Sequence, residues 1–233
     1  DKILMDLRSY AENIYIIPIL IFSVVIHEMA HAWVALKCGD TTAKDLGRIT
    51  LNPIPHIDLF GSIIIPLFSI IATGRVFIAW AKPVPIDPRN FSNFKRDDTL
   101  VTIAGPISNL IIALLCSFSV IGLYYLSAAV APAEGSFSFE FINYIFKMFY
   151  AGVLLNVSLA VFNMIPIPPL DGSHVLANLL PDELAMRYRS IGFMGIFILL
   201  ALFNFVPGFS QVFVSIITFV SKPYLNLIDV FIP

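Results

Sequence analysis

The chain has 233 residues, of which 58% are hydrophobic and 13% charged, about half the charged fraction usual for a soluble domain. This composition excludes an ordinary soluble protein, and a net charge of −2 gives no indication of nucleic-acid binding. The two cysteines, Cys38 and Cys116, form no CxxC pair, so neither a disulfide framework nor a thiolate metal site is expected.

Six apolar segments follow one another along the chain. They cover residues 13–36, 59–72, 100–129, 148–165, 191–206 and 209–220. A helix needs about 20 residues to cross the hydrocarbon core, so the second segment is too short for a comfortable span. We therefore expect one all-α polytopic membrane domain over residues 1–233, with five or six transmembrane helices embedded in the lipid bilayer. Its core lies at about 13–180, and two further helices lie at about 184–231.

Two polar stretches carry the signals of short strands. Arg48–Leu51 and Val76–Trp80 are rich in β-branched or aromatic residues and are bounded by Gly and Pro. The prolines at 83, 85 and 88 then favour an extended path with little helix. These patterns predict a small β hairpin or sheet at the membrane surface.

An HExxH motif, His27-Glu28-Met29-Ala30-His31, lies inside the first apolar segment. Residues four apart lie about one turn apart on one face of a helix, so both imidazoles can bind a single metal ion. Glu28 stands beside them, where it can accept a proton from a water activated by zinc. Three ionisable groups within five residues of a lipid-spanning helix are costly, which favours a metal site over core packing.

Catalytic zinc needs a third protein ligand and one open position. The candidates are His56, His174 and carboxylates near the membrane segments. Asp171 stands out among them, because it follows a helix broken by three prolines and precedes a glycine that permits a tight turn. Irregular backbone at membrane depth is tolerated only beside protein or a wet cavity, so the segment that carries Asp171 can reach inward.

Several motifs occur together in one order along the chain: HEMAH, then AGPISN at 104–109, then NMIPIPPLDG at 163–172. This set resembles the site-2 protease family of intramembrane zinc metalloproteases. The stretches LGRITLNPIPH and WAKPVPI are similar to its compact prokaryotic branch, without an inserted PDZ-like domain or a regulatory domain after the last span.

The resemblance implies that His27, His31 and Asp171 bind one Zn²⁺ per chain and that Glu28 is the general base. It also implies a substrate: a transmembrane helix of a membrane-tethered protein, cut after an earlier cleavage has removed its outer domain. Regulators and residual signal peptides in a bacterial or archaeal cell membrane are the implied substrate classes.

Two amides and two histidines remain to be assigned. Asn163 either makes an inter-helix hydrogen bond or donates to the oxyanion of the tetrahedral intermediate, whereas Asn109 is interpreted as structural. Because three ligands suffice, His174 is expected to pack or hydrogen-bond near the site rather than to bind the metal, and ligation by His56 is expected still less.

The metal site constrains the topology. If all six segments crossed, His31 and Asp171 would lie against opposite faces of the membrane. We therefore expect the 59–72 segment to enter and return, which leaves five crossings with residues 37–99, 166–190 and the C-terminal tail on one face. That face carries 11 of the 14 Lys and Arg residues. The positive-inside rule then predicts an active site towards the cytoplasm.

A helical substrate hides its carbonyls in hydrogen bonds and must unwind before attack. The Val76–Trp80 segment is predicted to offer an edge on which the unwound substrate adds as a strand. Two alternatives are a transporter that uses the same groups as a metal or proton pathway, and a non-catalytic membrane scaffold. Neither requires the HExxH spacing together with the Pro-broken LDG segment.

Overall fold

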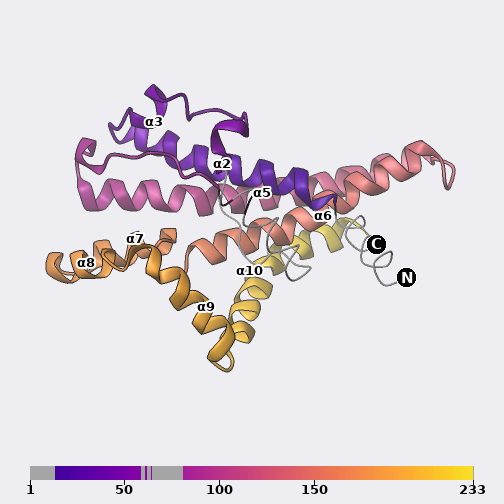
Figure 1. Ribbon diagram of the computed structural model, residues 1–233. Helices are drawn as coiled ribbons and strands as arrows, with labels where there is room; N and C mark the ends of the chain where they lie inside the picture. The colour runs from indigo at the N-terminus through magenta and orange to yellow at the C-terminus, as the bar shows by residue number, and fades with distance from the viewer. Residues whose placement is uncertain (1–13, 59–60, 62–63, 65–80, 233) are drawn as a thin grey trace.

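The computed structural model describes residues 14–58, 61, 64 and 81–232, and the part it describes is built from helices (Figure 1). Four of them are long and apolar enough to cross a membrane: α2 (Ile16–Lys37), α5 (Phe94–Val130), α6 (Phe137–Asn163) and α10 (Phe209–Phe231). The shorter α-helices are α3 (Thr42–Asp45), α7 (Asp171–Leu179), α8 (Asp182–Arg189) and α9 (Gly195–Phe205). The chain is thus a helical protein with the spans of a multi-pass membrane protein.

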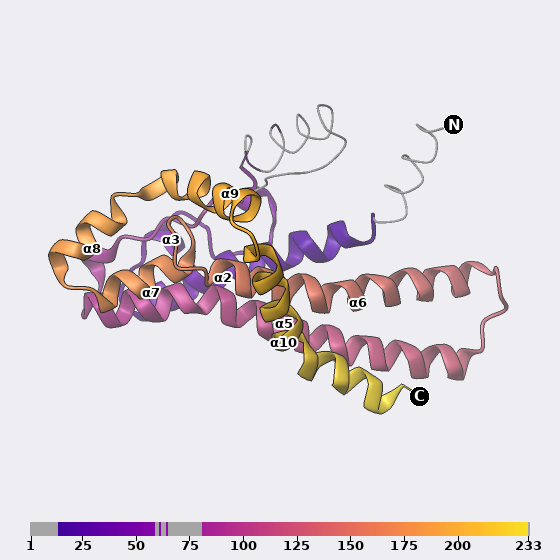
Figure 2. The ribbon, with the colours of Figure 1, turned by 90° about the horizontal axis from the view of Figure 1, so that it is seen from below.

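Helices α2, α5 and α6 pack along one another, and α10 closes over α5 and α6 (Figures 1 and 2). Their shared core consists of apolar side chains at Ile19, Ile112, Cys116, Val120, Val153 and Ile228. Gly152 lets α6 approach α5 and α2 closely, because a Cβ at this position would lie 2.9 Å from both Cys116 Sγ and Ile19 Cγ1. Small residues at such crossings are the usual means of close helix packing in membranes.

Helices α5 and α6 form a long hairpin that extends beyond the rest of the bundle (Figure 2). Asn93 caps α5 by accepting a hydrogen bond from Arg96 N, and Ser136 caps α6 by accepting one from Phe139 N. With 37 residues, α5 is about 55 Å long, well beyond the roughly 30 Å of a hydrocarbon core. The helix is therefore longer than a perpendicular crossing of the hydrocarbon core requires.

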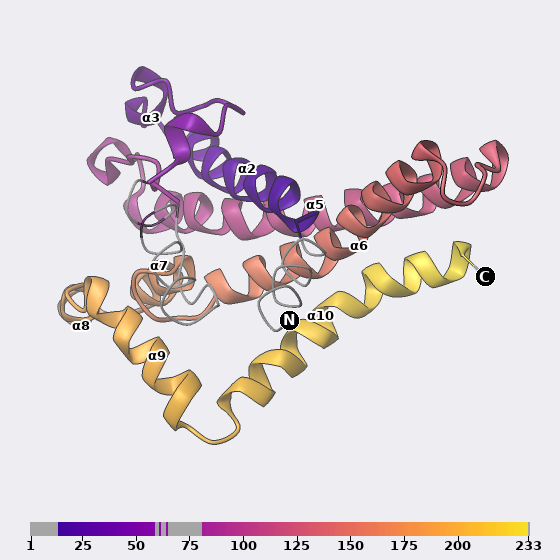
Figure 3. The same cartoon turned by 45° about the vertical axis from the view of Figure 1, so that its right-hand side comes forward.

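Helices α9 and α10 meet in a V-shaped bend at Gly208, whose φ is +86° (Figures 1 and 3). The end of α10 then lies beside the last turns of α5, where Tyr125 Oη donates to the Phe231 carbonyl at 2.9 Å. The start of the described chain lies at the same end, because the ring of Tyr15 is 6.4 Å from that of Tyr144. The prediction that the C-terminal tail lies on the catalytic face is therefore wrong.

The predicted five or six spans agree with the described residues only at the lower number, and only if one bent helix pair counts as a span. The described residues contain four candidate spans, or five if α8 and the 192–205 segment, bent by 68°, form a broken one. The 191–206 and 209–220 segments were expected to cross independently, but α9 has only 11 residues. Most of the 59–72 segment lies outside the described residues, so its re-entrant path stays a prediction.

The predicted β hairpin is not found in the part of the chain that the structure describes. Arg48–Leu51 forms bends rather than a strand, and none of the residues in the described ranges is in a strand. Arg48 explains the difference, because its side chain is buried and donates to the carbonyls of Lys82 and Pro83. Arg48 is thus joined to residues 82–83 through its side chain. Val76–Trp80 lies outside the described residues.

Replacing Gly152 by Ala tests the close packing of α5 and α6. Overpacking at this crossing should lower the free energy of unfolding by about 1–3 kcal/mol, measured as thermal unfolding in detergent. Gly122→Ala is the control, because Gly122 lies on α5 with no atom within 4 Å of its added Cβ. The control should leave stability unchanged or raise it by up to about 1 kcal/mol; equal effects of the two variants would contradict the packing argument.

Candidate active site

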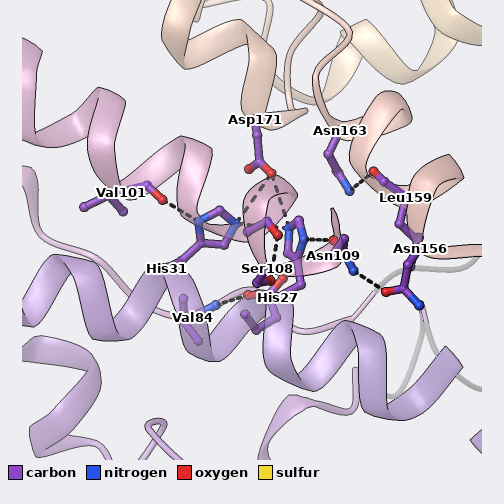
Figure 4. A network of polar contacts seen from close by, with 12 residues as sticks. His27, His31, Val84, Val101, Ser108, Asn109, Asn156, Leu159, Asn163 and Asp171 are labelled. Carbon is purple, nitrogen blue, oxygen red and sulfur yellow. Dashed lines mark hydrogen bonds and ion pairs between the residues drawn. The ribbon is translucent and has the colours of Figure 1, made fainter. Parts of the chain in front are cut away.

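The HExxH residues lie within α2, and the structure turns both imidazoles towards one point (Figure 4). His27 and His31 are buried, with 8% and 7% of their surface exposed. Their Nε2 atoms lie 3.1 Å apart. The helical spacing predicted from the sequence therefore brings the two nitrogens to a common site.

Asp171, the first residue of α7, brings a carboxylate oxygen to the same point (Figure 4). Its Oδ2 lies 3.2 Å from His27 Nε2 and 3.5 Å from His31 Nε2. All three ligand atoms lie within 4.8 Å of one another. Burial by itself raises the pKa of the Asp171 carboxyl, but its contacts with His27 and His31 outweigh burial and hold that pKa below its usual range.

Gly172 places Asp171 there, for a reason other than the expected turn. It lies inside α7 with helical backbone, and its Cα packs directly on the end of α6. A Cβ at this position would fall far inside van der Waals contact with the Met164 carbonyl oxygen. The glycine is needed for close approach, and this approach points the first residue of α7 at the two histidines.

The other ring nitrogen of each histidine is fixed by α5. His27 Nδ1 lies 2.6 Å from Asn109 Oδ1, and His31 Nδ1 lies 2.7 Å from the Val101 carbonyl oxygen. Both partners are acceptors, so each Nδ1 carries a proton and each Nε2 presents a lone pair to the site. The Asn109 amide in turn donates to Asn156 Oδ1 at 2.9 Å. Asn156 is fully buried and donates to the Gly152 carbonyl.

These residues fit a divalent metal ion. Two imidazole nitrogens and a carboxylate oxygen converge, and Asp171 Oδ2 is buried without a hydrogen-bond partner. Three acceptors this close need a shared proton or a cation between them, and two histidines with one carboxylate are a common catalytic zinc set. Gly105 of α5 completes the enclosure, since a Cβ there would lie 2.6 Å from His27 Nε2.

Glu28 points towards an extended segment, residues 81–87, that runs beside the metal site. The Val84 N–H donates to Glu28 Oε2 at 2.8 Å. One oxygen of the carboxylate is thereby oriented by backbone.

The segment is held at both ends. Lys82 N donates to the His56 carbonyl at 2.9 Å, and Arg48 Nη2 donates to the Lys82 carbonyl at 2.8 Å. At the other end, Asp87 N donates to Asp40 Oδ2 at 2.8 Å. Burial raises the pKa of Asp40, but the hydrogen bonds it accepts, from Thr42 and others, bring that pKa below its usual value.

One cavity of about 340 Å³ joins these groups. Its walls include His27, Glu28, His31, Asp171, Asn163, Asp98 and His174, together with Pro83, Val84, Ile86 and Val101. Asn163 lines it as expected, but its Nδ2 donates to the Leu159 carbonyl of its own helix at 3.0 Å. Its role in catalysis stays a prediction.

The other two histidines are not part of the cluster formed by His27, His31 and Asp171. His56 is buried and its Nε2 lies 3.1 Å from the Thr50 carbonyl oxygen. His174 Nδ1 lies 3.2 Å from Asp98 Oδ1.

Sequence reasoning missed three contributors: Asn156, Gly105 and Asp98. Asn109 was interpreted as structural, and it does bond to another helix, but it also holds His27. A signal for Asn156 was present, because an amide in an apolar helix needs a partner and it lies two turns before Asn163 on the same face.

Comparison with known proteins identifies the family. The model of peptidase family M50 matches residues 15–132 and 125–203. The chain belongs to this family. It is 36% identical over 189 residues to "Putative zinc metalloprotease YwhC" of Bacillus subtilis, covering 81% of this chain and 80% of that protein. It is 29% identical over 167 residues to "Putative zinc metalloprotease Rip2" of Mycolicibacterium smegmatis, covering 70% of this chain and 56% of that protein.

The Rip2 protein of Mycobacterium tuberculosis is also 29% identical, over 161 residues that cover 69% of this chain and 55% of that protein. No solved structure matches this one. Membership of family M50 makes the chain a metalloprotease, as the resemblance to site-2 proteases predicted, and its relatives imply zinc as the metal.

Asn109→Ala tests how α5 supports the metal site of this M50 chain. Loss of the acceptor for His27 Nδ1 should lower zinc affinity about 10–100-fold, measured by chelator competition on purified protein. Ser119→Ala on the same helix is the control, since its hydroxyl donates to the Leu115 carbonyl, a turn away on its own helix. Unchanged zinc affinity in Asn109→Ala would show that this hydrogen bond does not support the site.

Proposed function

We propose that this M50 metalloprotease hydrolyses peptide bonds within the transmembrane helices of membrane-tethered proteins. The observation that supports it is the position of His27, Glu28 and His31 inside α2, a helix apolar enough to cross the bilayer. Ionisable groups at such a depth are costly and are kept for function. A site there can reach a peptide bond that aqueous proteases do not.

One Zn²⁺ per chain would be held by His27, His31 and Asp171, whose atoms converge as described. When bound, zinc supplies a Lewis acid that lowers the pKa of water to about 7 and polarises a carbonyl. The oxygens that accept hydrogen bonds from Nδ1 of His27 and His31 keep both rings in the tautomer that leaves Nε2 free to bind the metal.

Glu28 is proposed as the general base. It lines the same cavity as the three ligands, and the Val84 N–H fixes one of its oxygens. Glu28 accepts a proton from the attacking water and passes it to the leaving amine nitrogen. Asn163 lines the cavity as well, and the amide hydrogen not given to Leu159 is available to the substrate carbonyl oxygen.

The substrate must enter this cavity unwound. A helix keeps its carbonyls in i→i−4 hydrogen bonds, so only an extended stretch exposes a carbonyl to attack. The cavity of about 340 Å³ beside the proposed ligands has room for a few residues of extended chain.

Cleavage of a single-span reporter tests the proposal. The reporter is an apolar helix of about 20 residues with an epitope tag at each end, reconstituted with the purified chain. The wild type should release both tagged fragments. Glu28→Gln should abolish turnover and retain zinc, because it removes the base and leaves the three ligands in place. Zinc in both proteins with cleavage by neither would contradict the proposal, and loss of zinc in Glu28→Gln would assign Glu28 a ligand or structural role.

The catalytic end is proposed to face the cytoplasm, because the loops there carry most of the Lys and Arg residues. In a Cys38→Ser, Cys116→Ser background, a cysteine replacing Glu134 on the α5–α6 turn should react with a membrane-impermeant maleimide on intact cells. A cysteine replacing Lys44 on α3 should react only after lysis. The reverse pattern would invert the orientation, and labelling of both on intact cells would contradict a separation by the membrane.

A further inference from the structure

A second polar cluster lies beside the metal site and is not explained by metal binding. It joins three helices: α5 contributes Asp98, α7 contributes His174 and Asn178, and α8 contributes Arg189. Asp98 and His174 line the same cavity as the HExxH residues.

The Asp98 carboxylate is held in place from several sides. It is 5% exposed, and its Oδ2 accepts a hydrogen bond from Asn178 Nδ2 at 2.8 Å. Arg189 Nη2 lies 3.8 Å from the same oxygen and donates to Asn178 Oδ1 at 2.6 Å. The other oxygen, Oδ1, faces His174 Nδ1 at 3.2 Å. A carboxylate with these donors acts as an acceptor, so the proton between Asp98 and His174 belongs to Nδ1.

This bond orients the histidine. With Nδ1 directed at Asp98, the opposite nitrogen, Nε2, points away from the carboxylate, and the His174 side chain is 48% exposed. His174 follows Asp171 by three residues on α7, so the two side chains lie on the same face of that helix. The histidine is therefore accessible to a substrate that occupies the cavity next to the proposed ligand.

We propose that His174, oriented by Asp98, contacts the substrate and donates a hydrogen bond from Nε2 to the carbonyl oxygen of the scissile peptide bond. With Nδ1–H directed at Asp98, donation from Nε2 requires the imidazolium form, whose positive charge would stabilise the negative charge that develops on this oxygen. His174 keeps its proton throughout. The water proton passes to Glu28 and then to the leaving nitrogen as the new C–O bond forms and the C–N bond breaks. The inference rests on the proteolytic function proposed above.

A purely structural role would have a different signature. The Asp98–His174 contact also ties α7 to α5, and α7 carries Asp171. If this were its whole purpose, replacing His174 would displace Asp171 and reduce zinc content together with activity. A contact to the substrate predicts a loss of kcat with zinc retained.

The test compares wild type, His174→Gln and His174→Arg, with Leu179→Gln at an exposed position of α7 as the control. Zinc content, kcat and KM are measured with the single-span reporter, and affinity is measured for a phosphinic peptide that mimics the charged oxygen. His174→Gln should retain zinc, lose about 10²–10³-fold in kcat with little change in KM, and bind the phosphinic peptide at least about tenfold more weakly. His174→Arg should recover at least about tenfold of the lost kcat, because it keeps a charged donor that does not give up its proton.

Three results would overturn the inference. These are an unchanged kcat and phosphinic-peptide affinity in His174→Gln, a loss of zinc that accounts for the loss of activity, and a failure of His174→Arg to recover any activity. The last would indicate proton transfer by the histidine. Failure of the wild type to cut the reporter would count against intramembrane cleavage instead, and the phosphinic-peptide affinities would still decide the role of His174.

Discussion

The candidate metal site depends on how α5 holds the two histidines of α2. Nδ1 of His27 is hydrogen-bonded to the Asn109 side chain and Nδ1 of His31 to the Val101 carbonyl, both on α5. Both Nε2 atoms therefore face the same point. This arrangement requires the two helix backbones to approach closely, and Gly105 provides the space. The hydrogen bonds also satisfy polar groups that would be costly to leave unpaired in an apolar environment. Helix packing and the chemistry of the site thus depend on the same contacts.

The third side of the site is built by an irregular segment that joins α6 to α7. The prolines at 166, 168 and 169 end the helical path, and the close approach of Gly172 to the Met164 carbonyl sets the position of α7. Gly195, at the start of α9, packs as closely on the Pro168 carbonyl. Two glycines therefore fix this segment from both sides. Asp171 can reach two residues of another helix because its own helix begins there.

Polar groups in this protein are concentrated at one end of the helical bundle. The metal-binding cluster, the second polar cluster around Asp98, and the hydrogen bonds that hold residues 81–87 all lie towards one end of the bundle. This is the end that carries α3, α7 and α8 (Figure 1). The opposite end is formed by the α5–α6 turn and the two ends of the described chain, where aromatic pairs such as Tyr15–Tyr144 and Tyr124–Tyr125 occur. This division matches a membrane enzyme in which water reaches the site from one face while the remainder is covered by lipid.

The sequence by itself determined the class of the protein, both boundaries of α2 and α5 to within several residues, and the three residues that the structure brings together at the candidate metal site. Composition, the four-residue spacing of His27 and His31, and the Pro-broken segment before Asp171 are local features, and local features can be deduced from sequence. Only the tertiary structure decided what holds those residues in place. Asn109 is hydrogen-bonded to His27 and to Asn156, Gly105 packs against both imidazole rings, and Asp98 is hydrogen-bonded to His174. It also replaced the predicted strand at 48–51 with a buried arginine and placed the C-terminus at the far end of the bundle. These features depend on contacts between helices distant in sequence, and hydrophobic periodicity in one helix does not specify which neighbour it meets or how closely.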